Sequence, residues 1–127
     1  MSDIKKRTSV LVVDDEPKVL RFIEIALRAR GFEVITANSG QEALDLVRSS
    51  NPEIMLLDIV MPGIDGFQVL KEIRTFTNLP VIVFSASPGN HQSALELGAN
   101  YFMTKPFDTD EMATRIKHLT GNSGNME

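Results

Sequence analysis

Two kinds of hydrophobic pattern alternate along the chain. Short apolar runs, rich in Val, Ile and Leu, are typical of buried strands and predict them at residues 9–13, 32–37, 53–57, 80–84 and 100–103. Between them, apolar residues recur every three to four positions, as in amphipathic helices, at residues 17–30, 40–50, 65–76, 91–97 and 108–119. This strict alternation predicts an α/β fold, in which a doubly wound parallel sheet carries helices on both faces.

Several of the predicted helix ends carry local signals. Pro17 fits the first turn of its helix, because backbone N–H groups in that turn have no acceptor within the helix and proline lacks such a group. Gly31 and Gly98 follow their helices and favour a left-handed closing residue. Asp108 is expected to cap the last helix, with Glu111 at the capping-box position.

The composition indicates one domain with its own hydrophobic core. The chain has 127 residues, 43% of them hydrophobic, which suits a single folded domain and excludes a disordered chain. It contains no cysteine, so disulfide, thiolate-zinc and cysteine-nucleophile chemistry are excluded. A net charge of −4 argues against a general affinity for nucleic acid, and no apolar run is long enough to span a membrane.

Residues 1–8 are expected to form a flexible arm, and residues 121–127 a flexible tail or linker stub.

Polar and charged residues stand at the carboxyl ends of the predicted strands, where parallel sheets bind ligands. Asp14 and Asp15 follow the first strand, Asp58 the third, Ser85 the fourth, and Lys105 lies just beyond the fifth. Three aspartates in one pocket repel one another, so either some are protonated or a cation neutralises them. Mg²⁺ suits such a site, because it binds one or two carboxylates, keeps several waters and accepts phosphate oxygens.

Together these groups are the parts needed to transfer a phosphoryl group onto an aspartate. Asp58 would attack phosphorus, Lys105 and Mg²⁺ would neutralise the equatorial oxygens, and Ser85 would bond to the product. Taken singly, each residue has an ordinary alternative role, as a helix-capping acid, a turn residue, a polar strand end or a surface lysine. The hypothesis therefore depends on their occurring together.

The same residues carry a resemblance to the receiver domain of bacterial response regulators, over residues 9–120. The matching blocks are Val-Val-Asp14-Asp15-Glu16, Leu-Leu-Asp58-Ile-Val-Met-Pro62-Gly63-Ile-Asp65-Gly66, Val-Phe-Ser85-Ala86 and Thr104-Lys105-Pro106-Phe107. The resemblance implies a five-stranded sheet of flavodoxin-like order 2-1-3-4-5, flanked by five helices.

By position, the resemblance also assigns roles at the acidic end of the site. Asp58 resembles the phosphoacceptor of the family. Asp15 resembles the direct Mg²⁺ ligand, and Asp14 the acid that acts largely through water. The backbone carbonyl of Val60 resembles a further metal ligand.

The remaining matched residues resemble the switch elements of the family. Ser85 matches the switch hydroxyl, Phe102 the switch aromatic, and Lys105 the lysine that contacts the phosphoryl group. The peptide bond between Lys105 and Pro106 is expected to be cis. Tyr101 is expected to point away from Phe102, because neighbouring strand residues face opposite sides.

The function implied is that of a two-component signalling switch in the cytoplasm. A sensor histidine kinase or a histidine phosphotransfer protein would donate the phosphoryl group, and a downstream effector or fused output domain would respond. The resemblance allows dimer formation on phosphorylation and implies no direct contact with nucleic acid or membrane. The domain would promote its own phosphorylation and dephosphorylation without turning over an external substrate.

Two features depart from the family pattern. From Ser85 to Gly98 the chain is about two residues shorter than expected and includes Pro88 and Gly89, which predicts a short, late-starting fourth helix. Val60 cannot position an attacking water through a hydrogen bond, which predicts slow loss of phosphate.

The two histidines, His91 and His118, are isolated and are interpreted as solvated helix residues.

Two alternatives come from other functional classes. A receiver-like interaction module independent of phosphorylation would keep the fold without the switch. An aspartate-nucleophile phosphohydrolase of the haloacid-dehalogenase kind needs a second aspartate at the position of Val60, and its cap domain does not fit in 127 residues.

Overall fold

The predicted architecture is confirmed by a computed structural model, which describes residues 7–61, 63 and 65–121. Five parallel strands form one sheet in the order β2-β1-β3-β4-β5. The strands are β1 (Ser9–Val13), β2 (Glu33–Ala37), β3 (Ile54–Asp58), β4 (Val81–Ser85) and β5 (Tyr101–Thr104). The helices are α1 (Pro17–Ala29), α2 (Gly40–Ser50), α3 (Gly66–Arg74), α4 (His91–Glu96) and α5 (Thr109–Thr120), with a 3₁₀ turn, η1 (Pro88–Asn90), before α4.

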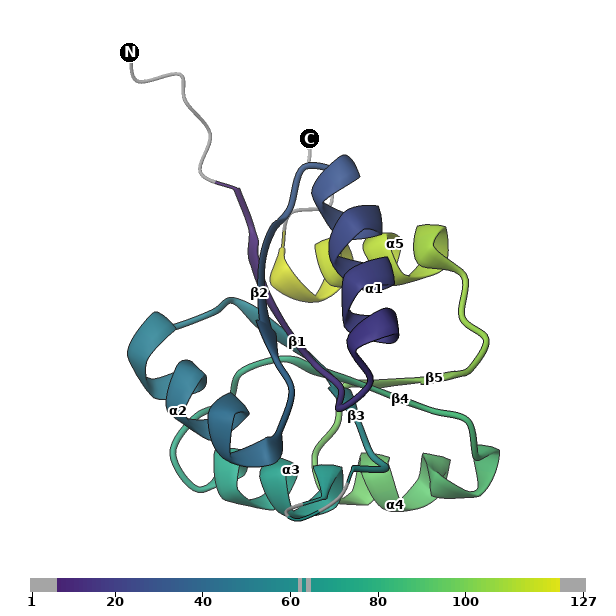
Figure 1. Cartoon of the computed structure of the whole chain (residues 1–127). Coiled ribbons are helices and arrows are strands. Elements are labelled where there is room, and N and C mark those ends of the chain that lie inside the picture. Colours follow the sequence, from purple (N-terminus) through teal and green to yellow (C-terminus); the bar gives the residue numbers. More distant parts are fainter. Residues whose placement is uncertain (1–6, 62, 64, 122–127) are drawn as a thin grey trace.

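Helices cover both faces of the sheet. Figure 1 shows α1 and α5 on one face and α2, α3 and α4 on the other. Along β1, Leu11 and Val13 belong to the apolar cluster under α2 and α3, whereas Val10 and Val12 belong to the cluster under α1 and α5. Every residue of β1, β3 and β4 is buried, so their continuous apolar runs fit strands covered on both sides. Burial of each large aliphatic side chain contributes about 1.5–3 kcal/mol, which gives the site a rigid base.

Three strands, β3, β4 and β5, end one residue later than predicted, and for β3 and β4 the added residue is polar and belongs to the predicted site. Asp58 pairs with Phe84 in the ladder between β3 and β4, and Ser85 pairs with Thr104 in the ladder between β4 and β5. Both polar residues are therefore the last residues of their strands rather than the first residues of the following loops. Strand pairing fixes the backbone of both residues, and therefore the positions from which their side chains extend.

The predicted helix ends are largely confirmed. Asp108 caps α5 and accepts hydrogen bonds from the backbone N–H groups of Asp110 and Glu111, at 2.8 and 3.4 Å. The Glu111 side chain accepts a hydrogen bond from the Tyr101 hydroxyl at 2.7 Å, so it bonds to β5 in place of the expected partner in a capping box. Gly31 and Gly98 have the predicted positive φ angles of 92° and 106°.

The prediction of a short fourth helix is also confirmed, because α4 has six residues. Its C-terminal end is tied to the rest of the fold by Arg74 of α3. The Arg74 guanidinium donates to the Gly98 carbonyl at 2.9 and 3.2 Å and to the Asn100 side chain at 3.1 Å. The same Asn100 oxygen accepts from the backbone N–H of Val81 at 2.9 Å, which joins this end of α4 to β4.

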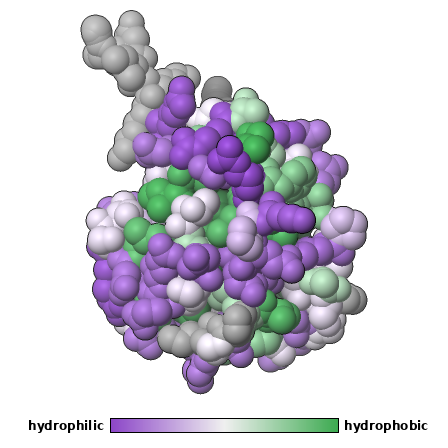
Figure 2. Space-filling model, in the orientation of Figure 1, coloured by the Kyte–Doolittle hydropathy of each residue, from purple (hydrophilic) through white to green (hydrophobic). Residues whose placement is uncertain are grey.

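The outer surface is mixed. Figure 2 shows polar residues over most of the face drawn, with separate apolar areas between them. Within the described part of the chain, no helix has the length and apolar character needed to cross a bilayer. Most of the predicted arm and tail lies outside the described residues; Thr8, at the end of the arm, is buried and its carbonyl accepts from Glu33 at 2.9 Å.

Candidate functional site

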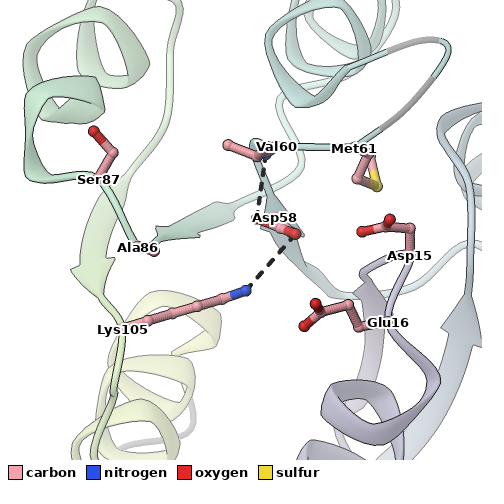
Figure 3. Close-up of a pocket in the computed structure, with 8 residues that line it drawn as sticks. All are labelled: Asp15, Glu16, Asp58, Val60, Met61, Ala86, Ser87 and Lys105. Atoms are coloured by element: carbon pink, nitrogen blue, oxygen red, sulfur yellow. Dashed lines mark hydrogen bonds and ion pairs between the residues drawn. The ribbon is translucent and has the colours of Figure 1, made fainter.

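A cavity of about 650 Å³ opens at the carboxyl ends of the strands, where the sequence predicts the site. It is lined by Asp15, Glu16, Asp58, Val60, Met61, Ala86, Ser87 and Lys105. Figure 3 shows Asp58 between Lys105 on one side and Asp15 and Glu16 on the other. Three separate strand ends and the loop after β5 thus supply one small, open, charged pocket.

The three predicted acidic residues lie together. One carboxylate oxygen from each of Asp14, Asp15 and Asp58 lies within 4.8 Å of the other two. Asp14 is fully buried and Asp58 is 4% exposed, whereas Asp15 is half-buried. Asp15 therefore presents the most accessible carboxylate of the cluster.

A small number of donors hold these carboxylates in place. Asp58 accepts from the backbone N–H of Val60 at 3.2 Å, and Asp14 accepts from that of Glu16 at 2.9 Å. The Lys105 ammonium lies 3.4 Å from Asp14 Oδ2 and 3.8 Å from Asp58 Oδ2. A single ammonium group thus faces two buried carboxylates.

The pKa values of the two buried carboxylates, Asp14 and Asp58, reflect their burial and their shared cation. Burial raises the pKa of Asp58 to about 6, and the negative charge of Asp14 adds to the increase. Lys105 and the Val60 N–H act in the opposite direction but do not cancel it. Burial also raises the pKa of Asp14. The one ammonium group that faces these two carboxylates therefore does not fully compensate their burial.

This incomplete compensation and the three clustered carboxylates fit a hard divalent cation. Carboxylate and carbonyl oxygens, with room for several waters, are the ligands that Mg²⁺ prefers. The half-exposed Asp15 and the open cavity leave a path for an ion to reach the buried oxygens. The acidic cluster is therefore consistent with Mg²⁺.

Close approach of the backbone also shapes the pocket. A Cβ atom added to Gly66 would lie 2.5 Å from the Asp58 carbonyl oxygen and 2.6 Å from Ile59 Cα, both in the backbone. The Gly66 N–H donates to the Ile59 carbonyl at 2.9 Å, which closes the loop after β3. Only glycine lets the start of α3 sit this close to the strand that carries Asp58.

The two predicted switch residues, Ser85 and Phe102, are not among the residues that line this cavity. Ser85 is fully buried, and its hydroxyl oxygen accepts from the backbone N–H of Ser87 and from the side chain of Asn90, both at 3.1 Å. The ring of Phe102 stacks on the ring of His91, with centroids 4.9 Å apart and planes 9° apart. His91 is exposed, as expected for a solvated residue, but this ring contact is not evident from the sequence.

Other details of the site agree with expectation. The peptide bond between Lys105 and Pro106 is cis. Tyr101 and Phe102 pack with opposite apolar clusters, so their side chains do point to opposite faces. Ser87 also lines the pocket, and its only sequence signal is its place two residues after Ser85 in a polar strand end.

Comparisons with known proteins agree with this geometry. The family model of the response regulator receiver domain matches residues 10–117. A probable transcriptional regulator, ycf27 of Guillardia theta, is 38% identical over 117 residues, which are 91% of this chain and 46% of the relative. The chain thus spans about half the length of this curated relative.

Solved structures give the same result. The receiver domain of Francisella response regulator 1452 is 35% identical, with a TM-score of 0.86 over 93% of this chain and 100% of that one. The response regulator TrrA of Thermotoga maritima, solved in complex with Mg²⁺ and BeF, is 34% identical, with a TM-score of 0.82 over 88% of this chain and 98% of that one. The chain belongs to the response regulator receiver domain family, whose members serve phosphorylation-based signalling.

The first prediction concerns Gly66. Gly66→Ala is expected to lower the free energy of unfolding by about 1–3 kcal/mol, because its methyl group meets rigid backbone. It should also weaken Mg²⁺ binding, because the end of β3 must shift. Gly89→Ala is the matched control: its Cβ would lie 3.7 Å from Ser87 Oγ, an ordinary contact, and the cost should stay below about 0.5 kcal/mol. Urea unfolding and a Mg²⁺ titration measure both effects, and equal results for the two variants would contradict the argument.

The second prediction follows from the raised pKa of Asp58. The folded state holds a proton on Asp58 more readily than the unfolded chain does, so metal-free protein should gain stability as the pH falls from about 7 to about 5. Asp58→Asn removes the buried charge and should stabilise metal-free protein by about 1–3 kcal/mol at pH 7.5.

With Mg²⁺ bound, the wild type should be more stable than Asp58→Asn, because the ion stabilises the charged wild-type site more than the neutral variant. Thermal unfolding with EDTA and with Mg²⁺ measures both effects, and Asp45→Asn, at an exposed position on α2, is the control. A metal-free wild type that is more stable than Asp58→Asn would contradict the prediction.

Proposed function

We propose that this domain accepts a phosphoryl group on Asp58 from a phosphohistidine and that the phosphorylated form has a changed partner-binding face. One observation carries the proposal: Asp58 lies at the end of a rigid strand, in an open pocket, between an ammonium group and two further carboxylates. This is the arrangement needed to attack an electrophilic phosphorus and to balance the charge that develops on its oxygens.

The chemical step is an in-line displacement. A carboxylate oxygen of Asp58 bonds to phosphorus while the phosphorus–nitrogen bond of the donor breaks, and the electron pair of that bond returns to the imidazole nitrogen. With a pKa of about 6, Asp58 is mostly ionised at neutral pH and is available as a nucleophile. The Lys105 ammonium is near enough to move from Asp58 Oδ2 onto a phosphoryl oxygen.

The metal site of this proposal is made by Asp14, Asp15 and Asp58, together with the backbone carbonyl of Val60. Mg²⁺ bound there supplies positive charge to the phosphoryl oxygens. Asp15 is the direct ligand on this proposal, because it is the most accessible acid of the cluster. Asp14 is completely buried and contacts Lys105, so it would act on a bound ion through water.

The surface beside the pocket supports a protein as the phosphodonor. A second cavity of about 320 Å³ is lined by Lys18, Val19, Phe22, Lys105, Pro106 and Phe107. It shares Lys105 with the phosphoacceptor pocket. Phe22 and Ile25, three residues apart on α1, are each 56% exposed, so apolar surface is available to a partner beside the pocket. A sensor histidine kinase or a histidine phosphotransfer protein could cover this surface while its phosphohistidine reaches Asp58.

The output of the switch is a second protein or a fused output domain. The phosphoryl group adds charge and acceptor oxygens at Asp58, and Ser85 turns to bond with one of them. Phe102 then moves from its position against α4, which alters the surface formed by α4, β5 and α5. Domains of this kind promote their own phosphorylation and dephosphorylation and turn over no external substrate.

The third prediction tests the phosphoacceptor. Incubation with acetyl phosphate and Mg²⁺ should add a single phosphoryl group to the wild-type chain, seen as one adduct by intact mass. Asp58→Asn, which keeps the shape of the side chain but removes the nucleophile, should show no adduct, and EDTA should abolish that of the wild type. Asp45→Asn should behave as the wild type.

A folded wild type without an adduct, from either acetyl phosphate or a phosphohistidine protein, would favour the alternative of a phosphorylation-independent interaction module. An adduct that persists in Asp58→Asn would contradict the assignment of the acceptor.

The fourth prediction concerns the lifetime of the phosphoryl group. Val60 lines the pocket and is 65% exposed, so its apolar side chain stands where a polar one could orient an attacking water. Val60→Asn is expected to speed hydrolysis at Asp58 by about 3- to 10-fold, the effect of one added hydrogen bond. Loss of the mass adduct over time measures the rate. Val60→Ala is the control for side-chain size, and an unchanged rate in Val60→Asn would contradict the argument.

A further inference from the structure

The short connection between β4 and α4 places two consecutive residues against the two switch residues. Asn90 ends η1 and immediately precedes α4, and His91 is the first residue of α4. The Asn90 side chain contacts Ser85, and the His91 ring contacts Phe102. One short piece of backbone therefore touches both parts of the proposed switch.

The contact with Ser85 fills the acceptor capacity of its hydroxyl. The oxygen accepts from the Asn90 amide and from the Ser87 backbone N–H, both at 3.1 Å, and a hydroxyl has two lone pairs. Ser85 is completely buried and does not belong to the side chains that line the phosphoacceptor pocket. A turn of Ser85 toward a phosphoryl group on Asp58 would break its hydrogen bond with Asn90.

The contact with Phe102 holds its ring at the edge of the core. Phe102 is half-buried against the cluster under α2 and α3, and its outer side is covered by the His91 ring. A centroid separation of 4.9 Å with nearly parallel planes is within the range of favourable aromatic pairs. Inward movement of Phe102 would separate the two rings.

The other end of α4 is fixed. Arg74 binds the Gly98 carbonyl and the Asn100 side chain, and Asn100 in turn is bonded to β4. Release of the contacts at Asn90 and His91 therefore affects the first turn of α4, while its last turn stays attached. A segment held at one end by two weak contacts, and at the other by a charged network, is suited to two discrete arrangements.

We propose that Asn90 and His91 are positioning residues that hold Ser85 and Phe102 in the unphosphorylated arrangement, so that the first turn of α4 is released when Asp58 is phosphorylated. This inference rests on the proposed function and specifies how the same site is regulated. It predicts that loss of either contact makes the activated arrangement easier to reach.

The test is a titration of the whole chain with beryllofluoride in the presence of Mg²⁺, followed by ¹H–¹⁵N NMR. The related TrrA was solved with Mg²⁺ and BeF, so beryllofluoride is a suitable probe of the activated form. Asn90→Ala and His91→Ala should each lower the midpoint concentration by about 3- to 10-fold, the effect of losing one hydrogen bond or one aromatic pair.

Two variants separate this effect from general loosening of the helix. His91→Phe keeps a flat ring and should restore the wild-type midpoint. Gln92→Ala changes the next exposed residue, whose side chain bonds to Glu96 within α4, and should leave the midpoint within about 2-fold of the wild type. Asn90→Ser, which also lacks the amide donor, replaces Asn90→Ala if thermal unfolding shows that the alanine variant does not fold.

The outcomes distinguish the two proposals. Midpoints of Asn90→Ala and His91→Ala equal to that of Gln92→Ala, or higher than that of the wild type, would overturn the positioning role while leaving the phosphoacceptor site intact. A wild type that binds no beryllofluoride and forms no phosphoryl adduct would overturn the proposed function, and the positioning role with it.

Discussion

The structure depends above all on two buried carboxylates that share one ammonium group. Asp14 and Asp58 are almost completely removed from water, and Lys105 lies 3.4 and 3.8 Å from their oxygens. Burial outweighs this attraction and raises both pKa values, so the arrangement costs stability when no cation is bound. The buried, largely apolar central strands β1, β3 and β4 offset that cost. The incompletely balanced carboxylates are consistent with Mg²⁺, and under the proposed function they also prepare the pocket for a phosphoryl group.

The fold supplies the precision that this chemistry needs. Parallel strands bring their carboxyl ends to one edge of the sheet, so acids far apart in the sequence meet without a long loop. Asp58 belongs to β3 itself, and its backbone pairs with Phe84 on the neighbouring strand. Gly66 then lets α3 begin directly against that strand end. Asp58 is therefore carried by a strand, and Asp14 and Asp15 directly follow another strand, β1.

The two residues of the proposed switch are held by contacts of a different kind from those at the acidic cluster. Ser85 and Phe102 are held by Asn90 and His91, which lie in a short turn and at the start of a six-residue helix. These contacts are a single hydrogen bond and a single ring stack, each of modest energy. The proposed function requires a rigid acceptor site beside a weakly held start of α4. Phosphorylation must then shift the surface of α4 without disturbing the pocket that holds the phosphoryl group.

The sequence by itself determined the order and type of the strands and helices, the caps of several helices, and the acids and lysine that meet in the pocket. Periodicity shows which residues face the core, and in a parallel sheet the strand ends must converge, so these features follow from local pattern and topology. Only the tertiary structure decided that Asn90 bonds to Ser85, that His91 covers Phe102, and that Glu111 bonds to Tyr101 rather than forming a capping box. Those contacts depend on the path of a loop and on side-chain rotamers. The raised pKa of Asp58 likewise depends on how deeply neighbouring elements bury it, which no local pattern records.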